Sequence, residues 1–337
     1  MQPENLPPEV PGDAPLVALR RGALVESVHR GRAAICDPRG VVVEAVGDAG
    51  SYVYARSSAK PFQAMPLVLS GAAGALGLTD EELAVTCASH NAEGPHLAAV
   101  RSILQKAGLS EKDLQNGAHP PLYAPAAAEL ARNGEEPGVI HGNCSGKHAG
   151  MLALCVHQGW ETGSYRDPDH PLQRWILEVV ARFCGLGRDE ILLGGDGCGV
   201  PAFGMPLENL ATGFARLATG ERLPEDLAEA AQRVRRAMRG HPFMVAGTER
   251  FDTAVMARTD LVSKIGAEAV FCAGSPEGWG LALKVSDGAA RALRPAVLAV
   301  LARRGVDLQD APLSHPVRDL HGAAVGRVAP LIQTELA

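Results

Sequence analysis

Short apolar runs open the chain and then give way to a helical period. Five runs between residues 16 and 55 have the length and alternation of β-strands, separated by turns that contain Gly, Pro, Arg or Asp. These runs are Leu16–Leu19, Leu24–His29, Ala33–Cys36, Val41–Val46 and Tyr52–Ala55. Because the spacers are short, we expect hairpins and therefore an antiparallel sheet.

From residue 61 onward, apolar residues recur at the spacing of amphipathic helices. The predicted helices are Pro61–Leu69, Glu81–Cys87, His96–Ala107, Ala126–Arg132, His148–His157, Leu172–Phe183, Leu207–Leu217 and Leu227–Met238. Strands return at Ala269–Ala273 and Gly280–Val285, a helix follows at Ala289–Arg303, and residues 323–334 supply a further strand or a tail. This order predicts an α+β protein whose sheet comes from both chain ends and whose helical part lies in the middle.

The domain organisation follows from the same pattern. Residues 1–15 carry acidic residues and five prolines but neither the basic nor the apolar region of a signal peptide, so we expect a flexible leader. No linker divides the remainder, which predicts a single catalytic domain over residues 16–337.

Composition excludes several classes of protein. The formal charge is −6 without blocks of like charge, which argues against nucleic-acid binding through a basic face. No apolar run approaches the ~18 residues of a membrane span, so no membrane partner is expected. Seven widely spread cysteines favour reduced thiols and a cytoplasmic location.

The first candidate for chemistry is the junction between a predicted strand and helix at residues 55–62. Ser57 and Lys60 are one helical turn apart and share a face. A buried lysine with a lowered pKa can take the proton of a serine and make it a nucleophile. The alternative is a helix cap beside a solvated lysine, and this spacing also arises by chance.

Three further stretches combine glycines with polar residues at element junctions. Residues 87–96 contain Ser89 and His90, which either face a pocket or cap the next helix. Residues 141–148 contain Cys144, Lys147 and His148, which could bind a metal or a substrate, or simply open a helix. A phosphate loop is excluded there, because Gly142 stands too close to Gly146 and His148 follows the lysine.

Residues 194–201 surround Asp196 and Cys198 with four glycines. Asp196 could hold a substrate ammonium, and Cys198 could join Cys144 at a metal, although the spacing does not define a standard zinc site. Residues 245–253 form a plausible pocket wall. Judged from local sequence alone, Lys264 beyond it is a surface lysine.

Taken together, these stretches resemble the thermolabile, rhizobial-type L-asparaginase family, often called asparaginase II. The resemblance runs from Arg21 to Gly288. Its motifs are Ser57-Ser-Ala-Lys60, Cys87-Ala-Ser-His90, Asn143-Cys-Ser-Gly-Lys-His148, Gly195-Asp-Gly-Cys-Gly-Val-Pro201, Val245-Ala-Gly-Thr248, Lys264-Ile-Gly-Ala-Glu268 and Leu283-Lys-Val-Ser-Asp-Gly288. One departure is Ala269, where we expect the family to have Gly.

The resemblance implies an α+β fold similar to serine β-lactamases and penicillin-binding proteins. It implies two Ser-Lys pairs, Ser57 with Lys60 and Ser89 with Lys264. It also implies a zinc site of Cys144, Lys147 and Cys198, and a substrate pocket with Arg56, His90 and Asp196. A homodimer is what the family suggests.

These implications predict hydrolysis of L-asparagine to L-aspartate and ammonia through an acyl-enzyme, with either Ser57 or Ser89 as the attacking group. Another amidohydrolase of the same fold, a glutaminase or a penicillin-interacting enzyme, is the nearest alternative, but the S-D-N and K-T-G motifs of β-lactamases do not occur. A non-catalytic metal or thiol sensor using Cys144 and Cys198 is the second alternative. It leaves both serines and their lysines without a role.

Overall fold

An antiparallel sheet is the framework of the computed structural model, which describes residues 12–308 and 311–333. Its eight strands run in the order β10-β11-β1-β2-β9-β8-β7, with β3 also paired to β2. The strands are β1 (Ala14–Arg21), β2 (Leu24–Cys36), β3 (Val42–Val46), β7 (Val262–Gly266), β8 (Val270–Ser275), β9 (Trp279–Val285), β10 (His315–Arg318) and β11 (Ala324–Pro330). Segments from both ends of the chain therefore build this sheet, and the predicted α+β class is confirmed.

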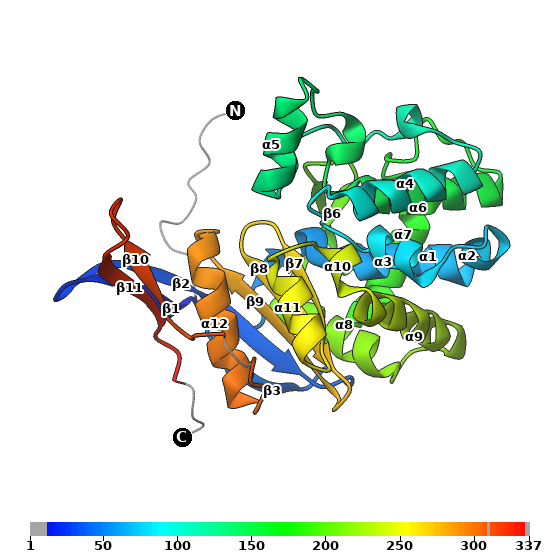
Figure 1. The fold of residues 1–337 in the computed structure, drawn as a ribbon. Helices are drawn as coiled ribbons and strands as arrows, with labels where there is room; N and C mark the ends of the chain where they lie inside the picture. The colour runs from blue at the N-terminus through cyan, green and yellow to red at the C-terminus, as the bar shows by residue number, and fades with distance from the viewer. Residues whose placement is uncertain (1–11, 309–310, 334–337) are drawn as a thin grey trace, which may run out of the picture.

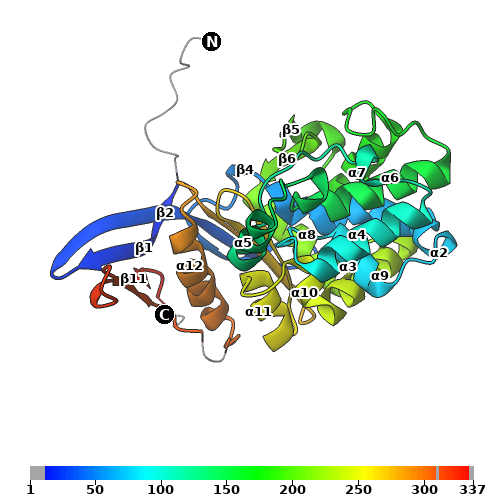
Figure 2. The same ribbon diagram turned by 45° about the horizontal axis from the view of Figure 1, so that its top comes forward.

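Most helices lie together on one side of the sheet (Figures 1 and 2). They are α1 (Lys60–Leu69), α2 (Ala72–Ala75), α3 (Asp80–Thr86), α4 (Gly94–Lys106), α5 (Ala124–Arg132), α6 (Ser145–Gln158), α7 (Pro171–Cys184), α8 (Leu207–Thr219), α9 (Glu225–Gly240), α10 (Pro242–Val245), α11 (Phe251–Arg258) and α12 (Ala290–Arg303). Of these, α12 crosses the sheet on the opposite face from α8.

Two apolar clusters lie on the two faces of the sheet. Ala34 and Cys36 belong to the cluster shared with α8, whereas Ala33 and Ile35 belong to the cluster shared with α12. Successive side chains of a strand point to opposite faces, so a strand covered on both sides is apolar throughout. At Gly280 the α8 backbone comes so close that a Cβ would overlap the carbonyl oxygen of Ala211.

Three further strands form a second, smaller sheet. β4 (Tyr52–Tyr54) pairs with β6 (Pro201–Pro206), which pairs with β5 (Leu192–Gly195). The expectation that Tyr52–Ala55 continues the N-terminal sheet is therefore wrong, because its hydrogen-bonding partner lies about 150 residues later, as the pairing of Tyr52 with Pro206 shows. The small sheet brings the glycine-rich stretch 194–201 beside the end of β4.

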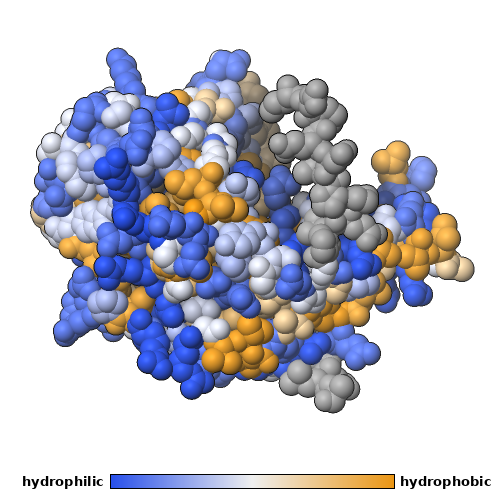
Figure 3. Space-filling model, turned by 180° about the vertical axis from the view of Figure 1, so that it is seen from behind, coloured by the Kyte–Doolittle hydropathy of each residue, from blue (hydrophilic) through white to orange (hydrophobic). Residues whose placement is uncertain are grey.

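The ends of the sheet differ in part from expectation. β1 begins at Ala14, inside the expected leader of residues 1–15, while residues 1–11 of that leader lie outside the described residues. β11 confirms the strand expected within residues 323–334. Exposed apolar side chains, among them Leu24, Val25 and Val28, lie on the arm formed by β1, β2, β10 and β11, at the right edge of Figure 3. Among the described residues, no helix has the length and apolar character required to cross a bilayer.

Candidate active site

Ser57 and Lys60 lie where β4 ends and α1 begins. A 3₁₀ turn, Arg56–Ala59, leads directly into α1, whose second residue is Pro61, a residue suited to the start of a helix. Ser58 Oγ donates to the carbonyl of Ala55 and fixes the turn. Lys60 is completely buried, so the alternative of a solvated lysine is wrong.

The Lys60 amine contacts the second predicted serine. Its Nζ lies 3.0 Å from Ser89 Oγ and 2.5 Å from the carbonyl oxygen of Ala88. Ser89 follows α3, and its N–H donates to the carbonyl of Val245, which fixes the position of the hydroxyl. Among the hydrogen bonds of residues 12–308 and 311–333, none joins Lys60 to Ser57. Lys60 is therefore joined by hydrogen bonds to Ser89 and, through it, to Lys264, and not to its predicted partner Ser57.

Lys264 approaches the same hydroxyl from the other side. Its Nζ lies 3.1 Å from Ser89 Oγ and 2.9 Å from the carbonyl oxygen of Ile265. The side chain is fully buried on β7, which corrects the expectation of a surface lysine. Burial lowers the pKa of Lys264 to about 8, although the nearby Asp252 carboxylate opposes that shift. An amine of that pKa can hold or release a proton near neutral pH.

A cavity of about 260 Å³ lies beside these groups. Its walls come from five separated segments, and they include Arg56, Ser57, Asn116, His119, Gly142, Asn143, Cys144, Asp196, Gly197, Cys198 and Ala267. Ser57 is therefore the serine that reaches the cavity wall. Ser89 is not among the lining residues and is only 5% exposed.

Arg56 and Asp196 form an ion pair at the cavity wall. Two guanidinium nitrogens of Arg56 donate to Asp196 Oδ1, at 3.1 and 3.0 Å. Burial alone would raise the pKa of Asp196, but the charge of Lys147, the Gly197 N–H and Arg56 together hold it below its usual value. One fixed cation and one fixed anion side by side are complementary to the α-carboxylate and α-ammonium of an amino acid.

Cys144, Lys147 and Cys198, the three residues that the family resemblance groups, lie together, and the two cysteines line the cavity. Lys147 Nζ lies 3.0 Å from Cys198 Sγ, and Lys147 is buried. A hydrogen bond from Cys198, opposed by burial and supported by the charges of Lys60 and Lys147, lowers the pKa of Cys144 well below its usual value. Burial alone would lower the pKa of Lys147, but the two sulfurs and Asp196 raise it to about 12.

The side chains of Cys144, Lys147 and Cys198 offer a metal ion two sulfurs and one amine. In the described part of the chain, no group of three or more His, Cys, Asp or Glu side chains is placed to hold a metal ion. The cluster here has two sulfurs and one amine, so a zinc ion would need Lys147 as its third donor. Thiolates are ligands that zinc prefers, and the two sulfurs lie beside the buried Lys147 amine, so this set would hold zinc only with Lys147 unprotonated, against the raised pKa of that amine.

His90 does not reach the cavity wall. Its Nδ1 accepts from the Ala92 N–H at 3.1 Å, and its Nε2 donates to Ser145 Oγ, whose proton goes to the carbonyl of Ile140. Burial lowers the pKa of His90 well below its usual value, so the ring is neutral. His90 thus joins the loop after α3 to the start of α6, and both its nitrogens are occupied by the protein.

Three wall residues and one buried residue escaped the sequence reasoning. His119, Asn116 and Asn143 line the cavity, and His119 Nε2 accepts from the Asn143 N–H. Asn143 lies in the motif Asn143-Cys-Ser-Gly-Lys-His148, whereas no local pattern distinguishes Asn116 or His119 from loop residues. Asp252, buried beside Lys264, stood within the stretch noted as a pocket wall.

Backbone strain concentrates near the site. Among described residues other than glycine, positive φ angles occur at Arg56, Ala92, Arg222, Glu249, Glu268 and Ala269. Apart from Arg222, all of these lie in or directly after the stretches that the sequence singled out. Strain of this kind persists where the surrounding structure enforces a functional geometry. Ala269, the departure from the family pattern, keeps the left-handed conformation with φ +53°.

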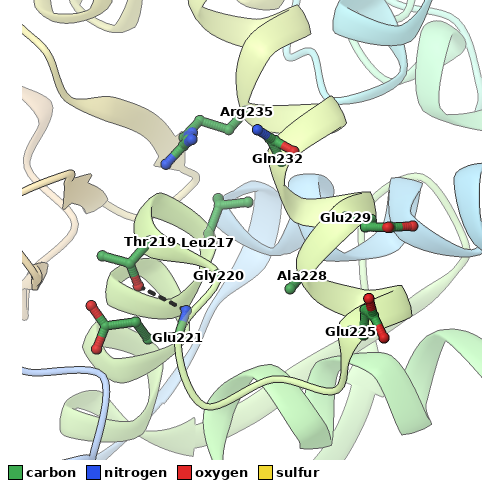
Figure 4. A pocket seen from close by; sticks show the side chains of 9 residues that line it. All are labelled: Leu217, Thr219, Gly220, Glu221, Glu225, Ala228, Glu229, Gln232 and Arg235. Atoms are coloured by element: carbon green, nitrogen blue, oxygen red, sulfur yellow. Dashed lines mark hydrogen bonds between the residues drawn. The ribbon is translucent and has the colours of Figure 1, made fainter.

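Larger hollows elsewhere lack comparable chemistry. One of about 450 Å³ lies between α8 and α9 and is lined by three glutamates together with Arg235 (Figure 4). Another of about 760 Å³ is lined by residues of α3, α4 and α10. Neither presents a Ser-Lys arrangement, so chemistry and not size selects the smaller cavity.

Comparison with known proteins shows the family of the chain. The family described as L-asparaginase II matches residues 17–330. The chain belongs to the L-asparaginase II family. This confirms the predicted family and supports an amidohydrolase that acts on a small amide substrate; the thermolabile subclass stays a prediction. No curated protein matches the sequence.

Solved structures show only a distant likeness to this member of the L-asparaginase II family. Mglu in its glutamate form is 15% identical with a TM-score of 0.40, over 90% of this chain and 67% of that one. A β-lactamase from Mycobacterium bovis is 14% identical with a TM-score of 0.40, over 82% of this chain and 95% of that one. The Bacillus subtilis glutaminase YbgJ, in a covalent complex with 5-oxo-L-norleucine, is 14% identical with a TM-score of 0.36, over 80% of this chain and 84% of that one.

Proposed function

We propose that the protein hydrolyses L-asparagine to L-aspartate and ammonia, with Ser57 as the nucleophile. The observation that carries this proposal is the position of Ser57 in the cavity wall next to the Arg56–Asp196 pair. Arg56 receives the substrate α-carboxylate and Asp196 the α-ammonium, which places the side-chain amide toward Ser57. The family membership supports amide hydrolysis as the reaction class.

In the proposed acylation step, Ser57 Oγ bonds to the amide carbon. The Ser57 proton passes to Ser89 Oγ as the Ser89 proton passes to the Lys60 amine, which lies 3.0 Å away and acts as the base in its unprotonated form. Backbone N–H groups at the 3₁₀ turn stabilise the oxyanion. The carbon–nitrogen bond then breaks as the proton passes from Lys60 through Ser89 Oγ to the leaving nitrogen, which departs as ammonia.

Deacylation reverses the roles. Water attacks the β-aspartyl ester, its proton moves to Lys60 through Ser89, and the proton is returned to Ser57 as the ester bond breaks. Aspartate leaves and the resting state is restored.

Zinc is part of the proposal as a bound ion at Cys144, Cys198 and Lys147. The bound ion would supply a fixed positive charge at the cavity wall that orients polar groups of the substrate. Neither proton transfer nor attack depends on it in this scheme. Cys144 and Cys198 line the cavity, and the buried Lys147 contacts Cys198.

The test is ammonia release from L-asparagine, L-glutamine and a β-lactam, each with and without a chelator. We expect turnover of L-asparagine in preference to the other two. Preferred turnover of glutamine or of the β-lactam would replace the proposed substrate. Metal binding without release of ammonia from any amide would favour the sensor alternative. Dimerisation remains a proposal from the family resemblance, and cytoplasmic location a proposal from the seven widely spread cysteines.

A further inference from the structure

Asp252 is a buried carboxylate that the proposed steps do not use. It lies in the first turn of α11, is 0% exposed, and is not among the residues that line the cavity. Its Oδ2 accepts from the Ile265 N–H at 3.0 Å and pairs with Lys264 Nζ at 3.5 Å. Its Oδ1 lies 3.4 Å from Ser263 Oγ. The carboxylate is therefore directed at Lys264 and not at a substrate.

Lys264 meets three acceptors. They are the Ile265 carbonyl, Asp252 Oδ2 and Ser89 Oγ. An ammonium has three N–H donors, so each acceptor here can receive one, and the direction toward Ser89 is fixed by the other two. A neutral amine would have only two donors for these three acceptors.

Lys60 has a different set of contacts. Its hydrogen bonds go to the Ala88 carbonyl and Ser89 Oγ, and its amine also faces the Cys144 sulfur, whereas the Asp252 carboxylate is paired with Lys264. Of the two amines at Ser89 Oγ, Lys264 is therefore the one whose ammonium form is matched by a buried carboxylate.

We propose that Asp252 is a positioning residue that holds Lys264 as an ammonium aimed at Ser89 Oγ. Ser89 then accepts a hydrogen bond on the Lys264 side and turns its own proton toward Lys60. Asp252 thereby sets the direction of the proton path. This inference rests on the proposed function where it concerns turnover, but the pairing of Asp252 with Lys264 stands on geometry alone.

Several charged groups surround Lys264 and decide its protonation. Burial lowers its pKa, Asp252 raises it, and Lys60 on α1 and Arg250 before α11 lower it. Cys87, after α3, stays a neutral thiol because burial raises its pKa to about 12. Asp252 is thus the group that raises the pKa of Lys264, and its removal must move the titration of Lys264 to lower pH.

The direct test follows the lysine ε-carbon resonances of ¹³C-labelled protein during a pH titration. The Lys264 signal is assigned by its loss in Lys264→Met. In Asp252→Asn we expect its midpoint to fall by about one pH unit or more. Ser263→Ala is the matched control, since it removes the other side-chain neighbour of the carboxylate and leaves the charge; its midpoint should equal that of wild type. An unchanged midpoint in Asp252→Asn would overturn the proposal.

Turnover gives the second readout. In Asp252→Asn the alkaline limb of kcat should move to lower pH by the same amount, with KM little changed. A purely structural role would lower kcat equally at every pH and overturn the proposal. An inactive wild type would refute the proposed function instead, and the titration would still decide the role of Asp252.

A paired variant covers the case in which Asp252→Asn fails to fold. Asp252→Asn with Lys264→Met removes both buried charges and should be more stable to urea than Asp252→Asn alone. A double variant no more stable than that single one would contradict the ion pair.

Discussion

The hydroxyl of Ser89 lies between two buried lysine amines, 3.0 Å from Lys60 Nζ and 3.1 Å from Lys264 Nζ. Lys60 thus bridges from the helix that begins beside Ser57 to a serine 29 residues further along the chain. Since Ser57 lines the cavity and Ser89 does not, the proposed mechanism assigns attack to Ser57 and proton transfer to Ser89.

Removing the cavity-facing hydroxyl should stop the reaction. For Ser57→Ala we expect a loss of kcat of about 10³-fold or more, because no nucleophile remains at the cavity wall. The fold should persist, since Ser57 is only half-buried and its loss leaves the lysine contacts intact. Ammonia release and circular dichroism measure the two effects.

A diazoketone analogue of L-asparagine separates the two serines. Such a compound alkylates the attacking oxygen, so Ser89→Ala should still gain the adduct mass, slowly, whereas Ser57→Ala should gain none. An adduct on Ser89 in the Ser57→Ala protein, together with retained turnover, would transfer the nucleophile role to Ser89.

The Arg56–Asp196 pair should govern substrate binding. Asp196→Asn keeps the shape but loses the charge that receives an ammonium group, so we expect KM to rise about 10-fold or more, with a smaller change in kcat. Asp189→Asn, on an exposed 3₁₀ turn before β5, is the control and should leave both constants unchanged. An equal KM in the two variants would remove Asp196 from the substrate site.

The sulfur cluster should determine metal content. Cys198→Ser removes one of two thiolate donors, so bound zinc measured by elemental analysis should fall from about one per chain to a small fraction, with a raised KM. Cys155→Ala, a buried thiol on α6 outside the cluster, should keep its zinc. Equal zinc in the two variants, or none in wild type, would reject the site.

Local pattern was sufficient for most helices and for β1 and β3, whereas the runs Leu24–His29 and Ala33–Cys36, predicted as separate strands, form the single strand β2. α1, α3, α4 and α6 to α9 lie where apolar residues recur at helical spacing, since each buries one face against neighbours close in sequence or on the sheet. The small sheet was missed because β4 and β6 pair across a long separation, and nothing local specifies such a partner.

The same reason limits the prediction of the site. Ser57 and Lys60 are one turn apart and were found by spacing, whereas Lys264 seemed a surface residue until its strand was seen to be covered on both faces. The family resemblance supplied the grouping of separated motifs. It did not supply the contact of Lys60 with Ser89 or the direction of the Asp252 carboxylate, which depend on tertiary packing.

α8 packs closely on β8 and β9, and β8 pairs with β7, the strand that carries Lys264. This packing predicts an effect on stability. A Cβ at Gly280 would overlap the Ala211 carbonyl and approach the Ala215 N–H, both of them rigid helix backbone. Gly280→Ala should therefore lower the free energy of unfolding by about 1–3 kcal/mol or more. Gly240→Ala at the end of α9, where a Cβ meets nothing within 4 Å, should be neutral or slightly stabilising. Urea denaturation of both variants measures the difference, and an equal effect at the two positions would show that α8 can move away from β9.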